Sequence, residues 1–425
     1  MTTTFSNLQS DLVTEILTRV PLKYMRAVRM TCKNWNDLSK NQIFTKMHID
    51  KAATTGKEGE TQMIVMMGYN LHLTNIFINE DPSIKQESKL CCLNKQVKIF
   101  KFINCEGLLL CILKEDSRVV VWNPYLGQPR WIIPRYSHSP YRCDGFSYAR
   151  GYEDKKNKSC RSHKLLRFLV YYVNPESDNH FLWYEIYDFD SDLWTTLDVV
   201  TPHFPHLYRS GVSLKGNTYW CAPKRNTDDE YGIICFDFTK ERFGSLLPLP
   251  FSAGPNDYVT LSCVREEKLA VLLQHNEYNP YELDIWITTK IEDEEVLWSK
   301  FLRIETEWDI CVPFISGNFF IDEENKVAIG FEEDNRHRVN IIGEAEYFRG
   351  LDLVGEFGDQ NYMPHLCSYV PSLVQIKQPE QGGEWKQESD VEKRRYDQNM
   401  LRFVSHLKRM NKLCGGGKRQ KKKNS

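Results

Sequence analysis

The stretch LQSDLVTEILTRVPLKYMRAVRMTCKNWNDLSKNQIF, residues 8–44, decides how the chain is organised. Apolar residues recur there at helical spacing, at Leu12, Val13, Ile16, Leu17 and Val20. Pro21 ends this helix because its ring clashes with the preceding turn. Two further short periodic runs follow, around Val28 and around Trp35. Three short helices bury little of their own surface, so the stretch is predicted to be a docking element whose apolar face a partner completes.

The same residues resemble the F-box family in order and spacing. The matching positions are Leu8, Asp11-Leu12, Glu15-Ile16-Leu17, Arg19-Val20-Pro21, Val28, Cys32-Lys33, Trp35 and Phe44. The sequence departs from the family at Gln9, where proline is usual. The resemblance implies binding to a Skp-type adaptor and, through it, to a cullin and a RING protein. The residues expected to contact the adaptor are Leu8, Leu12, Ile16, Leu17, Val20 and Pro21. The alternative is an ordinary helical hairpin that packs on its own domain.

Composition limits the class of protein. The 425 residues give room for one small element and one large domain, and 10 Trp with 21 Tyr favour strands. A formal net charge of −2 argues against a nucleic-acid surface along the whole chain. The 13 cysteines include no CxxC pair, which is typical of a reducing compartment. No secretory signal or spanning apolar run is visible, so we expect a soluble protein with a cytoplasmic or nuclear location, or both.

The middle of the chain consists of short apolar runs separated by turn residues, a pattern typical of an all-β domain, and it contains a weak internal repeat. Three segments place an aromatic residue directly before Asn or Asp: VVVWNP (119–124), YEIYDF (184–189) and IICFDF (233–238). A fourth, LDIWIT (283–288), lacks the acidic residue. The repeating units begin 46 to 63 residues apart, close to the length of one propeller blade. We therefore expect a β-propeller-like domain of six or seven blades in which the first and last strands share a blade. A pair of β-sandwiches or an irregular β domain is the alternative.

These segments also resemble the plant F-box-associated domain, a kelch-like type. The likeness is carried by GLLLCI (107–112), VVVWNP, GVSLKGNTYW (211–220), IICFDFTKERFGSLLPLPF (233–251), LDIWIT, LWSKF (297–301) and YVPSLVQI (369–376). The predicted domains are therefore an F-box over 1–50, a linker over 51–62, the β domain over 63–376 and a polar, basic tail over 377–425. The resemblance implies that the β domain is a receptor for a target protein.

No pattern in the sequence points to catalysis or to a cofactor. The histidines and cysteines lack the spacing of a zinc site, and no Gly-rich phosphate loop or GxSxG turn appears. We therefore predict no catalytic residue, no cofactor and no metal. The repeat aromatics Trp122, Tyr187, Phe236 and Trp286 are interpreted as core.

Loops are the places where a propeller face is expected to bind a target. Two candidate loops, 138–150 and 203–209, mix aromatic and basic residues, a mixture enriched at binding hot spots. The candidate target-binding residues in them are Tyr141, Arg142, Tyr148, His206, Tyr208 and Arg209.

The C-terminal tail, residues 377–425, differs in composition from the β domain. Residues 391–413 are predicted to form a helix with Met400, Val404 and Leu407 along one side. The basic run KRQKKK (418–423) is either a nuclear import signal or a solvated, disordered end, and nucleic-acid binding through so short a run is not expected.

The combined prediction is a non-catalytic, substrate-recognition subunit of an SCF-type ubiquitin ligase. It would bind a Skp-type adaptor through the F-box and an unknown target through the β domain. Two alternatives belong to other classes: a propeller-type ligand-binding protein or enzyme, for example a sugar-binding one, and an F-box scaffold that acts without a ligase.

Overall fold

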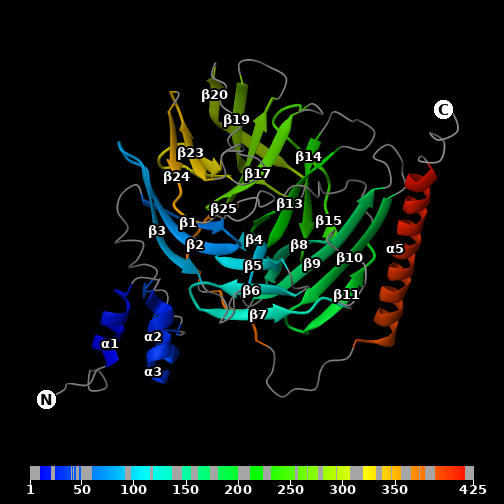
Figure 1. Ribbon diagram of the computed structural model, residues 1–425, viewed down its shortest axis with the longest axis horizontal. Coiled ribbons are helices and arrows are strands. Elements are labelled where there is room, and N and C mark those ends of the chain that lie inside the picture. Colours follow the sequence, from blue (N-terminus) through cyan, green and yellow to red (C-terminus); the bar gives the residue numbers. More distant parts are fainter. Residues whose placement is uncertain are drawn as a thin grey trace, which may run out of the picture. The chain divides into compact units, whose positions relative to one another are not determined.

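The computed structural model is mainly β, with a small helical element at the N-terminal end (Figure 1). It describes residues 10–20, 24–39, 41, 43–44, 47–48, 60–90, 97–114, 118–135, 146–154, 161–172, 180–199, 211–223, 231–253, 257–265, 267–275, 281–292, 294–306, 319–331, 337–345, 347–355, 365–372, 374–378 and 388–416. The chain divides into two compact units. Unit 1 comprises Met1–Pro134 and Ala253–Ile376, and unit 2 comprises Arg135–Ser252 and Lys377–Ser425.

The N-terminal element consists of α1 (Ser10–Leu17), α2 (Met25–Thr31) and α3 (Lys33–Leu38). Its centre is formed by Leu17, Met25 and Phe44, against which Val13, Val20, Val28, Trp35 and Leu38 pack. The element therefore has a small core of its own, built from one side of each helix. The prediction of three short helices is confirmed.

Unit 1 contains four antiparallel sheets. The first sheet has the strand order β25 (His365–Ser368)–β1 (Glu60–Met67)–β2 (Asn70–Phe77)–β3 (Ser83–Leu90), and the second has the order β4 (Ile99–Cys105)–β5 (Leu108–Leu113)–β6 (Val119–Asn123)–β7 (Gln128–Ile132). The third sheet has the order β17 (Tyr258–Val264)–β18 (Lys268–Gln274)–β19 (Tyr281–Ile291)–β20 (Val296–Thr306). The fourth has the order β21 (Phe319–Asp322)–β22 (Val327–Phe331)–β23 (Arg338–Gly343)–β24 (Phe348–Asp352). Neighbouring sheets share packed apolar cores, such as the one in which Ile64, Leu109 and Val120 meet.

Unit 2 contains two sheets and a long helix. The sheets are β11 (Leu193–Leu197)–β10 (His180–Asp188)–β9 (Arg161–Tyr172)–β8 (Phe146–Asp154), and β12 (Val212–Leu214)–β13 (Asn217–Pro223)–β14 (Tyr231–Asp237)–β15 (Arg242–Phe243), with β16 (Leu247–Pro248) beside β14. The helix is α5 (Asp390–Gly416). The described strands thus make six sheets, the blades of a propeller, and the smaller of the two expected blade numbers is correct.

The first and last strands of the β domain lie in one sheet, as predicted. β25 pairs with β1 from Met63↔Ser368 to Met66↔His365. A C-terminal strand therefore completes a sheet that otherwise consists of N-terminal strands. Such pairing leaves no long unpaired edge at the point where the chain begins and ends its sheets.

The repeated Asn or Asp proves to be a turn cap. Asn123 Oδ1 accepts hydrogen bonds from the backbone N–H groups of Tyr125 and Leu126, at 2.9 and 3.1 Å. Asp188 and Asp237 do the same for the two turns that follow them. Short polar side chains that bind the backbone two or three residues on favour such turns. In the segment 283–288 the residue directly after Trp286 is Ile287 instead of Asn or Asp, and its strand β19 continues to Ile291.

Three of the four repeat aromatics are buried as predicted. Trp122, Tyr187 and Phe236 are buried, and Trp122 and Phe236 belong to apolar cores. Trp286 differs, because it is only half-buried and the Lys300 ammonium lies 4.8 Å from its ring centre. Its neighbours Ile285 and Ile287 take the core positions on the other face of β19. The interpretation of Trp286 as core is therefore wrong, because side chains alternate between the two faces of a strand.

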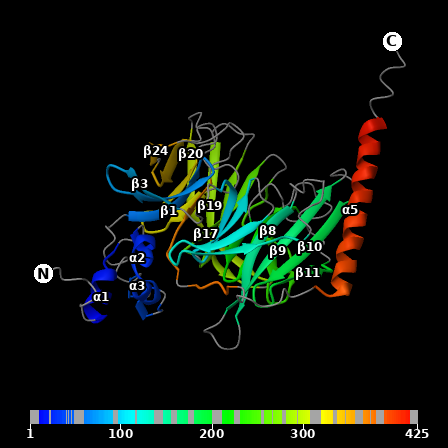
Figure 2. The same cartoon turned by 60° about the horizontal axis from the view of Figure 1, so that its bottom comes forward.

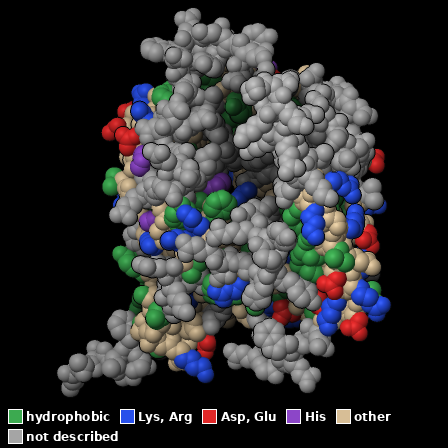
Figure 3. Space-filling view, turned by 45° about the vertical axis from the view of Figure 1, so that its right-hand side comes forward, with side chains coloured by type: hydrophobic (Ala, Val, Ile, Leu, Met, Phe, Trp, Pro, Cys, Tyr) green, Lys and Arg blue, Asp and Glu red, His purple; other side chains and the backbone are tan. Residues whose placement is uncertain are grey.

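Helix α5 packs on the sheet of β8–β11, along β10 and β11, in both ribbon views (Figures 1 and 2). Tyr396 and Phe403 of this helix are buried, and they meet Trp183 and Phe181 at ring-centre distances of 4.9 and 5.3 Å. Met400 and Leu407 pack beside them. With this side of the molecule turned forward, charged side chains of both signs lie beside hydrophobic ones on the surface (Figure 3).

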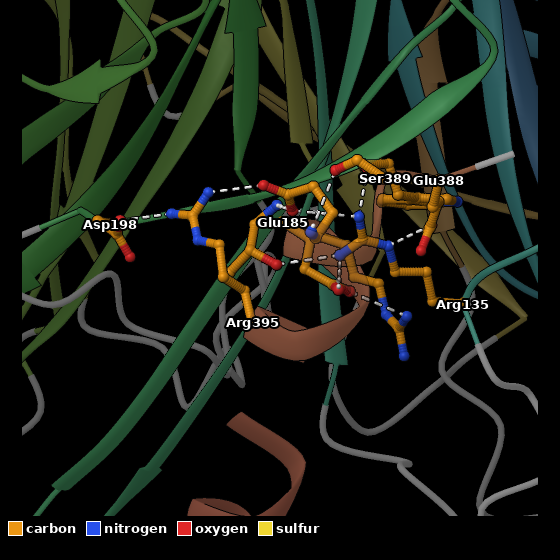
Figure 4. Close-up of polar contacts among 10 residues, drawn as sticks. Arg135, Glu185, Asp198, Glu388, Ser389 and Arg395 are labelled. Atoms are coloured by element: carbon orange, nitrogen blue, oxygen red, sulfur yellow. Dashed lines mark hydrogen bonds and ion pairs between the residues drawn. The ribbon is translucent and has the colours of Figure 1, made fainter. Parts of the chain in front are cut away.

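A buried ionic network joins the start of α5 to the same sheet (Figure 4). Arg135 donates to Glu185 at 3.3 Å, to Glu388 at 2.5 Å and to Glu392 at 3.4 Å. Glu392 Oε2 also accepts the backbone N–H of Thr196 at 2.9 Å. The chain therefore ties its C-terminal helix to β10 and β11 through charge-assisted bonds as well as aromatic packing.

The N-terminal end of α5 carries a helix-start signal. Ser389 Oγ accepts the backbone N–H of Glu392 at 3.3 Å, and Glu392 stands three residues later in the pattern of a capping box. Asp390 and Glu392 place negative charge at the positive end of the helix dipole. Burial raises the pKa of Glu392, but the hydrogen bonds from Thr196 and Arg395 lower this pKa by more than burial raises it. The net effect is a lowered pKa, so Glu392 is held as a carboxylate.

The stability of unit 2 is expected to fall in mild acid because of His163. This residue is buried on β9, and its Nδ1 atom accepts a hydrogen bond from Arg150 at 3.1 Å. Burial, then the charges of Arg150 and Arg161, lower its pKa to about 3. Below the unfolded value of about 6.5 the unfolded chain binds a proton that the folded chain does not, so stability drops by up to about 1.4 kcal/mol per pH unit.

The measurement is the unfolding midpoint at about pH 7.5 and about pH 5.5 for the natural chain and for His163→Asn. The loss on acidification should be smaller in the variant. An identical loss in both proteins would assign the pH dependence to other groups.

Candidate functional site

The exposed apolar side chains of α1 form the candidate adaptor surface. Leu12 and Ile16 are 51% and 44% exposed, and they lie four residues apart, on one side of the helix. Leu17, also predicted for this surface, is 2% exposed and belongs to the core of the element, and Val20 packs against that core. Leu8 and Pro21 lie outside the described residues. The structure therefore leaves Leu12 and Ile16 available for contact.

Other exposed apolar residues of the same element were not singled out from the sequence. They are Tyr24, Met30, Ile43 and Met47. Met30 lies on α2, and its exposed fraction of 77% is the largest of these. The signal that would have found Met30 is its position away from the Met25 and Val28 side of α2, which faces the core.

Among the described residues, the buried His48 joins the helical element to the β domain. His48 Nε2 lies 2.6 Å from the carbonyl oxygen of Val20, and its Nδ1 lies 2.8 Å from the hydroxyl of Tyr125. A carbonyl only accepts hydrogen bonds, so Nε2 carries the proton and Nδ1 accepts the Tyr125 O–H. Burial lowers the pKa of His48, and the nearby Arg29 lowers it too, which keeps this ring neutral.

A further described contact joins the two parts, because the Arg29 guanidinium lies 5.6 Å from the ring centre of Tyr125. Within the helical element, Phe44 stacks on His48 at 6.0 Å between ring centres. Tyr125 itself is presented by the turn that Asn123 caps between β6 and β7. The Asn123 amide also donates to the carbonyl groups of Ser372 and Val374, both at 2.9 Å. The helical element is therefore fixed to the end of the β4–β7 sheet where β6 ends.

Removal of the Tyr125 hydroxyl is expected to loosen this attachment. In Tyr125→Phe the buried Nδ1 atom of His48 loses its donor, a defect that costs about 1–3 kcal/mol. Backbone amides of α1, α2 and α3 should then exchange with deuterium faster, while amides of β4–β7 should not change. Tyr258→Phe is the matched control, since Tyr258 is exposed. Equal exchange rates in the two variants would contradict the importance of the His48–Tyr125 bond.

The loops predicted to bind a target are mostly outside the described residues. This applies to Tyr141, Arg142, His206, Tyr208 and Arg209. Tyr148 is described and corrects one expectation, because it lies in strand β8, paired with Arg167, and is half-buried. The segment 138–150 is therefore not wholly a loop: ladder hydrogen bonds to β9 take its last five residues, 146–150, into a sheet.

The described part of the chain contains no group of three or more His, Cys, Asp or Glu placed to hold a metal ion. Within that part no helix is both long and apolar enough to cross a membrane. The described features that bear on binding are the exposed apolar pair on α1 and the six sheets of the β domain.

Comparisons with known proteins agree with this arrangement. Residues 5–47 match the F-box domain, and residues 62–376 match the family described as the F-box associated beta propeller domain. The F-box/kelch-repeat protein At4g33290 of Arabidopsis thaliana is 55% identical over 420 residues, which span 94% of this chain and 96% of the relative. The F-box protein At2g38590 of the same plant is 52% identical over 428 residues, which span 96% and 99%.

Solved structures resemble the chain only weakly. A chain of the nidogen/laminin complex has a TM-score of 0.36 and 11% identity, with 72% of this chain and 98% of that chain covered. The tricorn protease has a TM-score of 0.32 and 8% identity, with 74% and 30% covered. Similarity at this level carries no argument about what the chain binds.

Proposed function

Because the chain belongs to the F-box proteins that carry an F-box-associated β-propeller domain, we propose that it is the substrate-recognition subunit of an SCF-type, cullin–RING ubiquitin ligase. In this role the F-box binds a Skp-type adaptor, and the β domain binds a target protein. The observation that carries the proposal is the exposed pair Leu12 and Ile16 within the matched F-box, because two aliphatic side chains in water on one helix face are stabilised by burial against a partner.

The proposed mechanism is proximity. The adaptor end is joined to the ligase, and the β domain holds the target nearby, so the lysines of the target experience a high local concentration of charged ubiquitin. The chain itself supplies no reacting group in this scheme. The buried His48–Tyr125 attachment supports it, because a fixed orientation between the F-box and the β4–β7 sheet keeps the target at a constant place relative to the ligase.

Reconstitution with purified proteins tests this function. The full chain is mixed with a Skp-type adaptor, a cullin and a RING protein, and the proteins that co-purify are identified. A substrate receptor should recover all three and should promote ubiquitin transfer to proteins bound by the β domain. Recovery of the adaptor without the cullin, or no ubiquitin transfer by a complete complex, would instead favour a scaffold that acts without a ligase.

We also propose a cytoplasmic or nuclear location, or both. The basic run 418–423 supports nuclear entry through its resemblance to import signals. A fluorescent fusion of the chain, with and without residues 418–423, measures the nuclear fraction. An unchanged nuclear fraction after the deletion would show that the run has no import role.

A further inference from the structure

Strand β11 is the last strand of its sheet among the described strands, and side chains close its outer edge. In that sheet β11 pairs with β10. The backbone N–H of Thr196, in β11, donates instead to the carboxylate of Glu392 on α5 at 2.9 Å. The backbone carbonyl of Trp194, two residues earlier, accepts a hydrogen bond from the Arg135 guanidinium. These two backbone groups therefore point away from β10.

The side chains of Arg135 and Glu392, here called the edge cap, take the place of a neighbouring strand. In an antiparallel ladder, alternate residues direct their N–H and C=O groups to the same neighbour. Trp194 and Thr196 are alternate residues, so a further strand would bind these groups. Arg135 supplies the donor of such a strand and Glu392 supplies the acceptor, and the two form an ion pair at 3.4 Å. Arg135 also donates to the Thr196 hydroxyl at 3.0 Å, which fixes the cap on the edge.

The edge cap is held by a helix that lies outside the propeller family match. That match ends at residue 376, and α5 comprises Asp390–Gly416. The helix lies along β10 and β11 (Figures 1 and 2), with Phe403 against Phe181 at 5.3 Å between ring centres. Just before the helix begins, Glu388 accepts a hydrogen bond from Arg135 at 2.5 Å (Figure 4). A segment added to the matched domain therefore closes the edge of one of its sheets.

Without the edge cap, the edge of β11 would be complementary to itself. When two copies of β11 pair antiparallel around Thr195, Thr196 of each copy lies opposite Trp194 of the other copy. Each Thr196 N–H then donates to the Trp194 carbonyl of the second copy, so both bonds now made to side chains are replaced. Such an interface uses the same surface in both copies and closes as a dimer. Proteins commonly cover a strand edge with a helix because an open edge pairs with another chain.

We propose that the β11 edge is a dimerisation surface for a second copy of this chain, and that α5 with Arg135 keeps this surface closed. The edge opens when α5 leaves the sheet. All the residues of the surface and of its cap belong to unit 2, and none belongs to the F-box. Dimerisation of this kind therefore does not depend on the proposed ligase function.

The test is the mass of the full chain in solution, measured by sedimentation, in two variants that release α5 by different routes. Arg135→Leu removes the guanidinium from the edge and from Glu392, and Phe403→Asp places a carboxylate in the aromatic contact with Phe181. The natural chain should be a monomer, and both variants should form a species of twice its mass. Leu401→Asp is the matched control, since Leu401 is exposed on the same helix, and this variant should stay monomeric.

A proline in β11 separates strand pairing from association through the apolar surface that α5 uncovers. Thr196→Pro removes the outward N–H, and proline is tolerated in edge strands. Added to Phe403→Asp, it should weaken dimerisation by at least about tenfold, because each dimer loses two backbone hydrogen bonds. Dimerisation that Thr196→Pro leaves unchanged would assign the association to the apolar surface and would overturn the proposal.

Cross-linking provides a second readout of the same pairing. Thr195 is exposed, and in the proposed dimer it lies opposite its own copy at a Cα–Cα distance of about 4.5 Å, which a disulfide can span. With a thiol oxidant, Thr195→Cys combined with Phe403→Asp should give a covalent dimer. Thr195→Cys alone should not, because its edge is closed, and cross-linking there at an equal rate would contradict the role of α5 as a cap.

Deuterium exchange shows whether each variant is folded and whether α5 has left the sheet. Amides of β8 and β9 should stay protected in Arg135→Leu and Phe403→Asp, while amides of α5 exchange faster. A variant with a protected sheet, an exchanging α5 and the mass of a monomer would overturn the proposal. The two variants act at opposite ends of the α5 contact, so the test still stands if one of them unfolds.

Discussion

Replacing Leu12 and Ile16 together with aspartate should abolish co-purification of a Skp-type adaptor. Both side chains are exposed on one face of α1, and burial of a leucine or isoleucine contributes about 1.5–3 kcal/mol each. The double change removes this gain and also places two carboxylates in an apolar interface, where charge without a partner is costly. We therefore expect a loss of adaptor affinity of at least about a thousandfold, measured by pull-down from purified components.

Two controls separate lost contact from lost folding. Leu401→Asp carries the same kind of change at an exposed leucine of α5, and adaptor capture should be normal in that variant. Leu17→Asp should abolish capture for a different reason, because Leu17 lies in the core of the helical element and its charge would unfold α1–α3. Deuterium exchange of the helix amides should rise in Leu17→Asp and stay unchanged in the Leu12 and Ile16 variant. Adaptor binding that survives the double change would remove the ligase assignment.

Replacing Arg135 with leucine should destabilise unit 2 by about 3–5 kcal/mol, the usual cost of removing one partner of a buried ion pair. Arg135 and Glu185 have side chains that are 2% and 0% exposed. Burial raises the pKa of Glu185, and the charges of Arg167 and Arg135 oppose that effect. Without Arg135 the Glu185 carboxylate keeps a single guanidinium, from Arg167 at 3.1 Å, and Glu388 and Glu392 lose their common partner.

The expected consequence is release of α5 from the sheet, seen as faster deuterium exchange across α5, β10 and β11 in the full chain. Arg395→Leu is the matched control. Arg395 pairs with Glu392 and Asp198 at a partly exposed position, so its loss should cost less than about 1 kcal/mol.

The double variant Arg135→Leu with Glu185→Leu is the sharper experiment. It removes both members of the Arg135–Glu185 pair, so the loss of stability should be smaller than the sum of the losses in Arg135→Leu and Glu185→Leu. Additive losses in the double variant would mean that the two charges act independently, which contradicts the structure of the network.

Much of the fold is encoded in local patterns and could be predicted. The helical spacing of Leu12, Ile16 and Leu17 identifies α1, and Pro21 predicts that the helix does not continue past that position. The repeated aromatic–Asn or aromatic–Asp pair identifies strands followed by turns, because such side chains cap the turn that comes next. These patterns depend on interactions between residues a few positions apart, so they can be recognised without knowing how the rest of the chain folds.

The sequence pattern alone did not show which face of a helix or strand is buried. Leu17 and Ile16 both fit the helical spacing of apolar residues, yet only Ile16 is exposed. Leu17 is buried because Met25 and Phe44 pack against its side of α1. Trp286 fits the repeat as well as Trp122 does, yet it faces away from the core of its sheet. Periodicity states which residues share a face, but the neighbours that pack against each face decide which one is buried.

By itself, then, the sequence determined the N-terminal helices, the all-β character of the larger domain and the turns that separate its strands. Only the tertiary structure decided the number of sheets, the His48–Tyr125 attachment and the docking of α5 through Arg135. Each of these joins residues on separate elements, in most cases far apart in the sequence. Such contacts depend on the free-energy cost of closing long loops and on how well the packed surfaces fit together, and the spacing of nearby residues predicts neither of these.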